Sequence, residues 1–293
     1  MLTQEDGEKI YAAPCAAQRP PKVREATQFD GSIAKSQILN SGIFGASPTF
    51  VLHFTPATLS DSLVIIPTYN ERENIVRMIE TVMGLEVDLD VLIVDDGSPD
   101  GTAELVRTQQ AVYPDRIHLL ERAGKQGLGT AYIAGFHWGL ERTYDYIFEM
   151  DCDFSHRPQD LIRLREALVN GADVAVGSRY VRGGGVENWP ADRLILSRGA
   201  SIYTRLITWM PVMDPTAGFV GYRRRVLETI DLDKIRFIGY AFQIEMKFSA
   251  WRKGFRIEEV PITFTDRIEG VSKMSKGIIK EAVFGVVQMR LRG

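Results

Sequence analysis

The chain has 293 residues, of which 45% are hydrophobic and 25% are charged, and its formal net charge is −3. These proportions are typical of globular proteins and exclude a chain that is disordered along its whole length, a collagen-like repeat and a coiled coil. Its two cysteines are too few for a disulfide scaffold. No apolar run reaches the roughly 18 residues that would predict a transmembrane helix.

Charge is distributed unevenly along the chain. Acidic residues outnumber basic ones up to residue 176, and the opposite holds from residue 177 to the end. One interpretation is two solvated faces of opposite charge. The other is an acidic half that holds a cation and a basic half that binds a phosphorylated or anionic partner. The basic residues are not interleaved with stacking aromatic residues, so nucleic acid is not expected as a partner.

Residues 1–58 differ in composition from the rest. They contain several prolines, many alanine, serine and glutamine residues, and no sustained helical or strand periodicity. Such a segment is expected to be a poorly ordered N-terminal extension, with a loosely packed arm as the alternative. Residues 59–293 are then expected to form a single domain.

From residue 63 the pattern becomes regular, because short apolar strands alternate with helical segments. This alternation predicts an α/β fold with a mostly parallel, twisted sheet and helices on both faces, in which ligands bind at the carboxyl ends of the strands. The predicted strands are at 63–67, 91–94, 117–120, 146–150 and 174–176, and the predicted helices between them are at 70–83, 100–112, 127–140 and 157–170.

The pattern loosens after residue 180. Three glycines at 183–185 are expected to form a flexible link. Beyond this link, the predicted elements are a helix at 193–210, a strand at 219–222, a helix at 241–252, a strand at 257–264 and a helix at 278–291.

The tripeptide Asp151-Cys152-Asp153 follows a predicted strand. In an extended segment, residues i and i+2 point to the same side, so the two carboxylates are expected to converge where the strand ends. Proteins commonly hold Mg²⁺ or Mn²⁺ with one or two carboxylates and substrate phosphates. The alternative is a solvated loop, which the position directly after a strand disfavours.

Two further polar segments follow other strands. The carboxylates of residues 95–98 could accept hydrogen bonds from a base or a ribose, or the segment could be an ordinary tight turn. The glycine-rich segment 124–129 opens a helix, where backbone N–H groups can approach a phosphate, and a plain turn is again the alternative. Its spacing matches neither the phosphate loop of nucleoside triphosphatases nor the glycine motif of dinucleotide dehydrogenases, so neither class is supported.

Together, these motifs resemble those of family 2 glycosyltransferases with the GT-A fold. The segments that carry the resemblance are 64–71, 94–98, 124–129 and 151–156. Segments 177–180, 214–219 and 239–243 are similar to those of the polyprenol- or dolichol-phosphate mannosyltransferases. The resemblance implies a single catalytic GT-A domain within residues 59–293 and leaves residues 1–58 outside.

The resemblance implies a nucleotide-sugar site in the acidic half. It places Asp151 and Asp153 on a Mg²⁺ or Mn²⁺ ion that bridges the diphosphate, and Ser155 as a weaker or water-mediated ligand, because that position is often glutamine in the family. Gln243 and Glu245 would lie near the sugar. The residues implied to bind the nucleotide of the donor are Pro67, Tyr69, Glu71, Asp95, Asp96 and Lys125.

The same resemblance implies an acceptor-phosphate site formed by Arg179, Arg193 and Ser197. Arg193 and Ser197 are four residues apart, so on a helix they share one face. Arg267 would cover the active site, and Asp153, Arg179 and Arg267 would be its catalytic residues. Arginine suits such a site because its guanidinium group can bind phosphate oxygens bidentately.

The implied reaction transfers mannose from GDP-mannose to a polyprenyl (dolichyl) phosphate with inversion at the sugar. The acceptor phosphate is already anionic at neutral pH and needs no general base, so His156 is expected to have a local structural role or a role in supporting the metal ligands. The alternatives are a polyprenyl-phosphate glucosyltransferase that uses UDP-glucose and a nucleotide-sugar-binding subunit without activity. Gln243 is not followed by the Arg-Trp pair of processive enzymes, which argues against a polysaccharide synthase.

A lipid acceptor without a transmembrane helix implies a protein that is peripheral at the cytoplasmic face of a membrane, and a small membrane-protein partner stays open. Helix 278–291 combines apolar and basic residues, and it is either an interfacial helix or one packed on its own domain. A second candidate surface on helix 193–210 consists of Leu194, Ile195, Ile202, Tyr203, Leu206 and Trp209.

Overall fold

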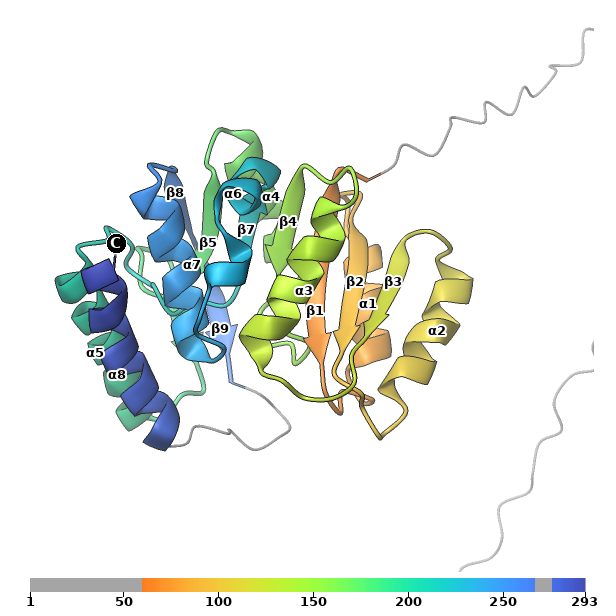
Figure 1. Ribbon diagram of the computed structural model, residues 1–293. Helices are drawn as coiled ribbons and strands as arrows, with labels where there is room; N and C mark the ends of the chain where they lie inside the picture. The colour runs from red at the N-terminus through yellow and green to blue at the C-terminus, as the bar shows by residue number, and fades with distance from the viewer. Residues whose placement is uncertain (1–59, 267–275, 293) are drawn as a thin grey trace, which may run out of the picture. The chain divides into compact units, whose positions relative to one another are not determined.

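A seven-stranded sheet organises the computed structural model of the chain, which describes residues 60–266 and 276–292 (Figure 1). The predicted N-terminal extension lies outside the described residues. From one edge of the sheet to the other, the strands are β3 (Ile117–Glu121), β2 (Asp90–Asp95), β1 (Ser62–Thr68), β4 (Tyr146–Glu149), β7 (Val220–Arg223), β5 (Val174–Ser178) and β8 (Ile257–Pro261).

Strand β7 runs antiparallel to its neighbours β4 and β5, whereas the other neighbouring strands are parallel. The prediction of a mostly parallel sheet is therefore confirmed. Strands β1 and β2 are almost completely buried, because helices cover both faces of the sheet. Alternate side chains of β1 point to opposite faces: Val64 and Ile66 pack in one core, and Leu63 and Ile65 pack in another.

Helices form a layer on each face of the sheet. Helix α3 (Leu128–Leu140) approaches β1 closely at Gly135, where a Cβ atom would lie only 2.6 Å from Cγ2 of Ile65. A glycine therefore sets the distance between α3 and the sheet. The helices of the first core are α1 (Ile75–Met83), α2 (Thr102–Val112) and α4 (Asp160–Val169), and those of the second are α3 (Leu128–Leu140), α6 (Arg224–Thr229) and α7 (Tyr240–Arg252).

Two more helices, α5 (Ala191–Thr208) and α8 (Lys276–Arg292), lie side by side next to these layers (Figure 1). Val286 and Met289 of α8 pack in a third core with Ile244 and Phe248 of α7. Part of the last predicted helix is thus packed on its own domain. In the part of the chain that the structure describes, no helix is long and apolar enough to cross a membrane.

The predicted strand at 257–264 is wrong in its extent, because it is divided in two. Strand β8 ends at Pro261, and β9 (Thr263–Thr265) pairs with β6 (Gly185–Glu187) in a separate two-stranded sheet. The Ile262 N–H still donates to the Ser178 carbonyl of β5, whereas the Ile262 carbonyl accepts from the Gly185 N–H, so the chain changes its partner strand at Ile262. The segment predicted to be a flexible link therefore leads into a strand.

The helices of the structure also differ from the predicted ones in two places. The first helix begins at Ile75 instead of residue 70, because Asn70 has a φ of 60° and residues 72–74 form a turn. The short helix α6 was not predicted, since its six residues are too few to show a helical period.

Candidate active site

The loops after β1 and β2 contain the predicted nucleotide-binding residues. Asp95 is 1% exposed and accepts hydrogen bonds from the Thr68 hydroxyl at 2.8 Å, the Ser98 hydroxyl at 2.6 Å and the Ser98 backbone N–H at 2.8 Å. Pro67 and Glu71, at and just after the end of β1, are half-buried. Asp95 therefore ties the two loops together, a structural contribution that the sequence did not reveal.

Asp96, another predicted nucleotide-binding residue, forms an ion pair with Arg122. The Arg122 Nε is 2.9 Å from Oδ1 of Asp96. Burial raises the pKa of Asp96, and the positive charge of Arg122 partly offsets this effect. The exposed ammonium group of Lys125 lies 4.8 Å from the centre of the Tyr69 ring, a cation–π distance that brings two predicted nucleotide residues together.

The loop after β4 contains the predicted metal ligands. Asp151 Oδ1 accepts a hydrogen bond from the Tyr132 hydroxyl at 3.2 Å, and Asp153 Oδ1 accepts one from the backbone N–H of Ser155 at 3.0 Å. Burial, reinforced by the nearby negative charge of Asp151, raises the pKa of Tyr132 well above its ordinary value. Phe154 turns the loop with a φ of 57°, a conformation that is uncommon for a bulky residue and recurs at functional sites.

These residues fit a divalent cation. Ser155 is 1% exposed, and its Oγ has no hydrogen-bond partner. Within residues 60–266 and 276–292, no group of three or more His, Cys, Asp or Glu side chains is arranged to hold a metal. The protein would therefore supply two carboxylates and the Ser155 hydroxyl, and would leave the other positions to substrate phosphates and water, as is usual for Mg²⁺.

A buried polar group formed by Glu149, Gln243 and Lys247 adjoins this loop, because Glu149 is the last residue of β4. Each of the three is at most 3% exposed. The Gln243 amide donates to Glu149, and the Lys247 ammonium donates to the Gln243 carbonyl at 3.0 Å, to Gln243 Oε1 at 3.2 Å and to the Ala217 carbonyl at 2.6 Å. Burial raises the pKa of Glu149 and lowers that of Lys247. Lys247 thus fixes the orientation of Gln243.

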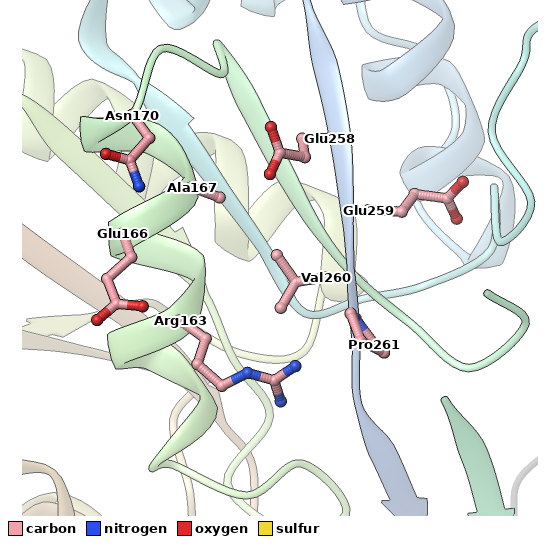
Figure 2. A pocket seen from close by; sticks show the side chains of 8 residues that line it. All are labelled: Arg163, Glu166, Ala167, Asn170, Glu258, Glu259, Val260 and Pro261. Carbon is pink, nitrogen blue, oxygen red and sulfur yellow. The ribbon is translucent and has the colours of Figure 1, made fainter. Parts of the chain in front are cut away.

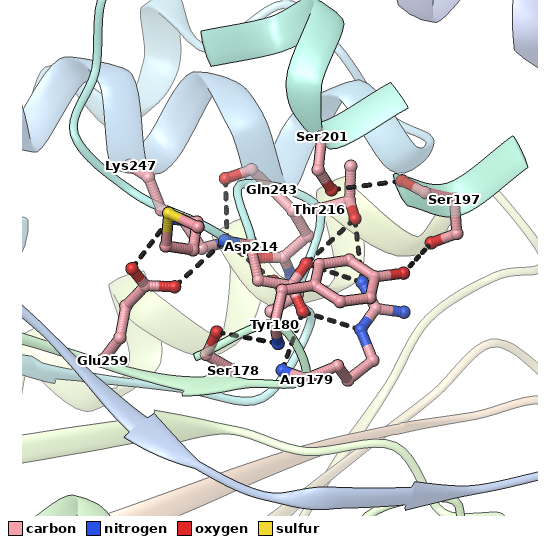
Figure 3. Close-up of polar contacts among 12 residues, drawn as sticks. Ser178, Arg179, Tyr180, Ser197, Ser201, Asp214, Thr216, Gln243, Lys247 and Glu259 are labelled. Atoms are coloured by element: carbon pink, nitrogen blue, oxygen red, sulfur yellow. Dashed lines mark hydrogen bonds and ion pairs between the residues drawn. The ribbon is translucent and has the colours of Figure 1, made fainter. Parts of the chain in front are cut away.

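Arg179 directly follows β5 and is held by a buried carboxylate (Figure 3). Its Nε and Nη2 donate to the two oxygens of Asp214, each at 2.7 Å, and Nη2 also donates to Thr216 at 2.8 Å. Asp214 is completely buried. Burial alone would raise its pKa, but the charge and hydrogen bonds of Arg179 outweigh that effect and hold the pKa below its ordinary value.

The structure brings the other two predicted acceptor residues to the same region. The guanidinium carbons of Arg193 and Arg179 lie 4.2 Å and 5.5 Å from the centre of the Trp189 ring. Ser197 accepts a hydrogen bond from the Tyr180 hydroxyl at 2.7 Å, as Figure 3 shows. Trp189 and Tyr180 therefore organise this cluster, although only Tyr180 belonged to a motif singled out in the sequence.

Strand β9 connects this cluster to the loop after β4. The backbone N–H of Thr265 donates to the Ser155 carbonyl at 3.1 Å, and Arg193 donates to Oδ1 of the next residue, Asp266, at 2.7 Å. Arg267, the remaining predicted catalytic residue, lies outside the described residues.

Two other residues named in the sequence interpretation have clear structural contacts. His156 is 3% exposed, and its ring centre lies 5.0 Å from that of Phe219 and 5.1 Å from that of Phe264. These ring contacts support the structural role expected for His156. Glu245 accepts a hydrogen bond from the backbone N–H of Phe237 at 3.1 Å and so anchors the segment before α7.

A cavity of about 260 Å³ lies between α4 and β8 and is separate from these residues (Figure 2). Arg163, Glu166 and Glu259 are among its lining residues, and none of the predicted site residues lines it. The cavity is therefore not part of the candidate site.

The sheet order, with polar loops at the ends of β1, β2 and β4, defines a GT-A glycosyltransferase fold. Glucosyl-3-phosphoglycerate synthase from Mycobacterium tuberculosis, solved with Mn²⁺, UDP and glucosyl-3-phosphoglycerate, is similar with a TM-score of 0.57, 15% identity and 78% of each chain covered. The mannosyltransferase PcManGT from Pyrobaculum calidifontis, solved with GDP-Man and Mn²⁺, is similar with a TM-score of 0.51, 16% identity and 81% of this chain and 74% of that chain covered.

The chain belongs to glycosyl transferase family 2, which it matches over residues 63–231. It is 50% identical over 241 residues to polyprenol monophosphomannose synthase of Mycolicibacterium smegmatis, with 81% of this chain and 91% of the relative covered. It is 49% identical over 229 residues to undecaprenyl-phosphate mannosyltransferase of Micrococcus luteus, with 78% and 93% covered. Dolichol-phosphate mannosyltransferase of Pyrococcus furiosus is 38% identical over 226 residues, with 74% and 60% covered. The predicted family and fold are confirmed.

Proposed function

We propose that the protein transfers mannose from GDP-mannose to a polyprenyl phosphate and so forms a polyprenyl-phosphate mannose. The observation that carries this proposal is the arrangement of two carboxylates after β4 and two arginines beside Trp189, joined through β9. The names of the three relatives, which refer to mannose and to a polyprenol, undecaprenyl or dolichol phosphate, support the same substrates.

On the donor side, Asp151 and Asp153 would hold Mg²⁺ or Mn²⁺ at the diphosphate of GDP-mannose. When bound, such an ion stabilises the negative charge that develops on the departing GDP. Tyr132 and the Ser155 N–H keep the two carboxylates in place. Gln243, oriented by Lys247, would lie near the sugar, and Tyr69 and Lys125 would contact the nucleotide.

On the acceptor side, Arg179, Arg193 and Ser197 would bind the phosphate of the polyprenyl phosphate. A phosphate oxygen is anionic at neutral pH, so it can attack the sugar carbon without losing a proton. Direct displacement then inverts the configuration at that carbon. Asp214 and Trp189 would hold the arginines in position for this attack.

The membrane surface is the proposed place where the protein meets its acceptor, and the outward face of α5 supports this. The helix buries Ser201, Thr204 and Thr208, although these are among its more polar residues. The hydroxyls of Ser201 and Thr208 donate to carbonyls four residues earlier, so their burial leaves no donor unsatisfied. The apolar residues exposed on α5 instead are Ile195 (72%), Leu196 (46%), Ile202 (55%) and Leu206 (69%), and Trp209 (72%) directly follows the helix.

Helix α8, which contacts α5, also exposes large apolar side chains. Phe284 is 73% exposed and Leu291 is 82% exposed, while Val286 and Met289 pack inward. Large exposed apolar side chains on two adjacent helices fit the interface of a bilayer, into which such side chains insert. The protein would accordingly be peripheral at the cytoplasmic face of a membrane.

Incubation of the protein with labelled nucleotide sugar, a short-chain polyprenyl phosphate and Mg²⁺ or Mn²⁺ tests the transfer. We expect label from GDP-mannose in the organic extract, and none after the cation is chelated. Label from UDP-glucose instead would identify a glucosyltransferase. Binding of GDP-mannose without transfer would identify a non-catalytic subunit. Both outcomes would contradict the proposal.

A further inference from the structure

A groove of about 380 Å³ lies at the C-terminal end of α5. At 1.5 Å per residue along α5, Arg205 lies roughly 12 Å from Ser197 and roughly 18 Å from Arg193, two of the predicted acceptor-phosphate residues. The residues that line the groove are Ile202, Arg205, Leu206, Trp209, Met210 and Pro211.

Arg205 is the charged residue of this groove. Its Nε is buried and has no hydrogen-bond partner. By contrast, the guanidinium groups of Arg179 and Arg193 both donate to carboxylates. Because Nε has no protein acceptor and the Arg205 side chain is only half-buried, the guanidinium group can turn toward an anionic ligand that brings an acceptor.

Trp209 forms another part of the groove and has an unusual conformation. Its φ is 59°, although its side chain is bulky, and it is 72% exposed. Arg290 of α8 places its guanidinium carbon 4.9 Å from the centre of the Trp209 ring, which adds a second positive charge next to the groove. The left-handed conformation ends α5, a position where glycine is usual, and here it carries a large ring that lies mostly in solvent.

We propose that this groove binds the phosphate head group of an anionic phospholipid, with Arg205 donating to the phosphate and Ile202, Leu206 and Trp209 contacting the acyl chains. A free phosphate would leave the apolar walls exposed, whereas a lipid covers them. Tryptophan also favours the bilayer interface, where its ring is buried and its N–H stays hydrated. The inference rests on the membrane-facing part of the proposed function and does not depend on the transfer reaction.

Binding of the full chain to vesicles tests the site. The vesicles contain phosphatidylcholine with or without phosphatidylglycerol, and no polyprenyl phosphate is present. We expect Arg205→Gln to weaken binding to the phosphatidylglycerol vesicles by about tenfold or more, because a hydrogen bond to a charged group is lost. Arg205→Lys keeps the charge but lacks the fork of donors, so it should restore only part of the affinity.

Arg292→Gln is the matched control, because Arg292 is an exposed arginine on the adjacent α8 and does not line the groove. Loss of one charge from general attraction to an anionic surface should cost it no more than about fivefold. Near-ultraviolet circular dichroism of each variant verifies that the fold is retained.

Equal losses in Arg205→Gln and Arg292→Gln, or full recovery in Arg205→Lys, would overturn the proposal in favour of general electrostatic attraction. Displacement of the protein from vesicles by glycerol phosphate would overturn the lipid as the ligand. A wild-type protein that glycosylates a short-chain acceptor but ignores vesicles would disprove this site and leave the transfer reaction intact. The expected Arg205 effect in a protein without transferase activity would support the groove and disprove the transfer.

Discussion

The two halves of the candidate site hold their charged residues in different ways. On the proposed donor side, Asp151 and Asp153 accept hydrogen bonds from a tyrosine hydroxyl and a backbone N–H, which orient the carboxylates. On the acceptor side, Arg179 and Arg193 each donate to a carboxylate. Neutral donors thus orient the carboxylates of the proposed donor half, whereas carboxylates fix the geometry of the arginines in the proposed acceptor half.

Replacement of Asp214 should break the acceptor half most severely. Asp214→Asn leaves Arg179, whose side chain is 10% exposed, without its buried counter-charge, so we expect a loss of about 3 kcal/mol in the free energy of unfolding. Urea denaturation measures this loss. The control is Glu228→Gln, which breaks the more exposed ion pair with Arg224 and should cost less than about 1 kcal/mol. Equal costs would show that the buried pair has no special role.

The same pair predicts a pH dependence. The folded-state pKa of Asp214 is lowered, so the stability that its charge provides is present at neutral pH and is lost as the pH falls through that pKa. The wild type and Asp214→Asn should therefore approach each other in stability in acid. A constant difference across the pH range would contradict this assignment.

On the donor side, Asp153→Asn should reduce transfer by at least about 100-fold, because it removes charge needed to hold a metal that contributes several kcal/mol. Turnover of GDP-mannose with a saturating cation measures the loss. Asp231→Asn, which changes an exposed carboxylate paired with Lys234, is the control. Near-normal turnover of Asp153→Asn would disprove the metal site.

Arg193→Ala should reduce catalytic efficiency toward the acceptor by roughly 10- to 100-fold, the value of one or more charge-assisted hydrogen bonds. Steady-state kinetics with varied polyprenyl phosphate measures this change. Arg107→Ala removes an arginine that is also paired with a carboxylate, Glu121, but lies on α2, and it should leave the efficiency unchanged. Similar losses in both variants would indicate a general effect of lost positive charge.

Tyr132→Phe should have a smaller effect on the donor half. It removes the hydroxyl that orients Asp151 and keeps the ring that stacks on Phe242, so we expect Mn²⁺ to bind about tenfold more weakly. Electron paramagnetic resonance of free Mn²⁺ in the presence of GDP measures this affinity. The control is Tyr144→Phe. In the wild type, the Tyr144 hydroxyl donates a hydrogen bond to Asp90 at 2.9 Å, away from the loop that contains Asp151. Unchanged Mn²⁺ affinity in Tyr132→Phe would show that the hydroxyl does not position the ligand.

The smallest effect is expected from removal of residues 1–58, which contain no periodic apolar face. A chain that starts at Leu59 should keep its melting temperature and its activity. Insoluble or inactive protein would show instead that this segment belongs to the domain.

Much of the fold could be predicted from the sequence, because each strand of a sheet covered on both faces is a short apolar run between polar turns. Strands β6 and β9 could not, since each has three residues and forms only through pairing with the other. The extent of β8 was also missed, because the change of partner at Ile262, from β5 to β6, depends on pairing between separate segments of the chain.

The site could be predicted where a motif follows a strand, as Asp151 and Asp153 do. Glu149 and Lys247 were missed because a charged residue usually lies on the surface, and their burial depends on packing between β4 and α7. A charge within an otherwise apolar run was the available signal. Trp189 was missed because nothing in the sequence shows that its ring packs against Arg179 and Arg193, although both lie within ten residues of it.

Calorimetric titration of GDP-mannose with Mn²⁺ into the Arg193→Ala and Asp153→Asn variants tests the division between the two halves most directly. We predict that Arg193→Ala binds the donor as tightly as the wild type does, and that Asp153→Asn binds it at least about tenfold more weakly. Equal weakening in both variants would contradict a donor half and an acceptor half with separate tasks.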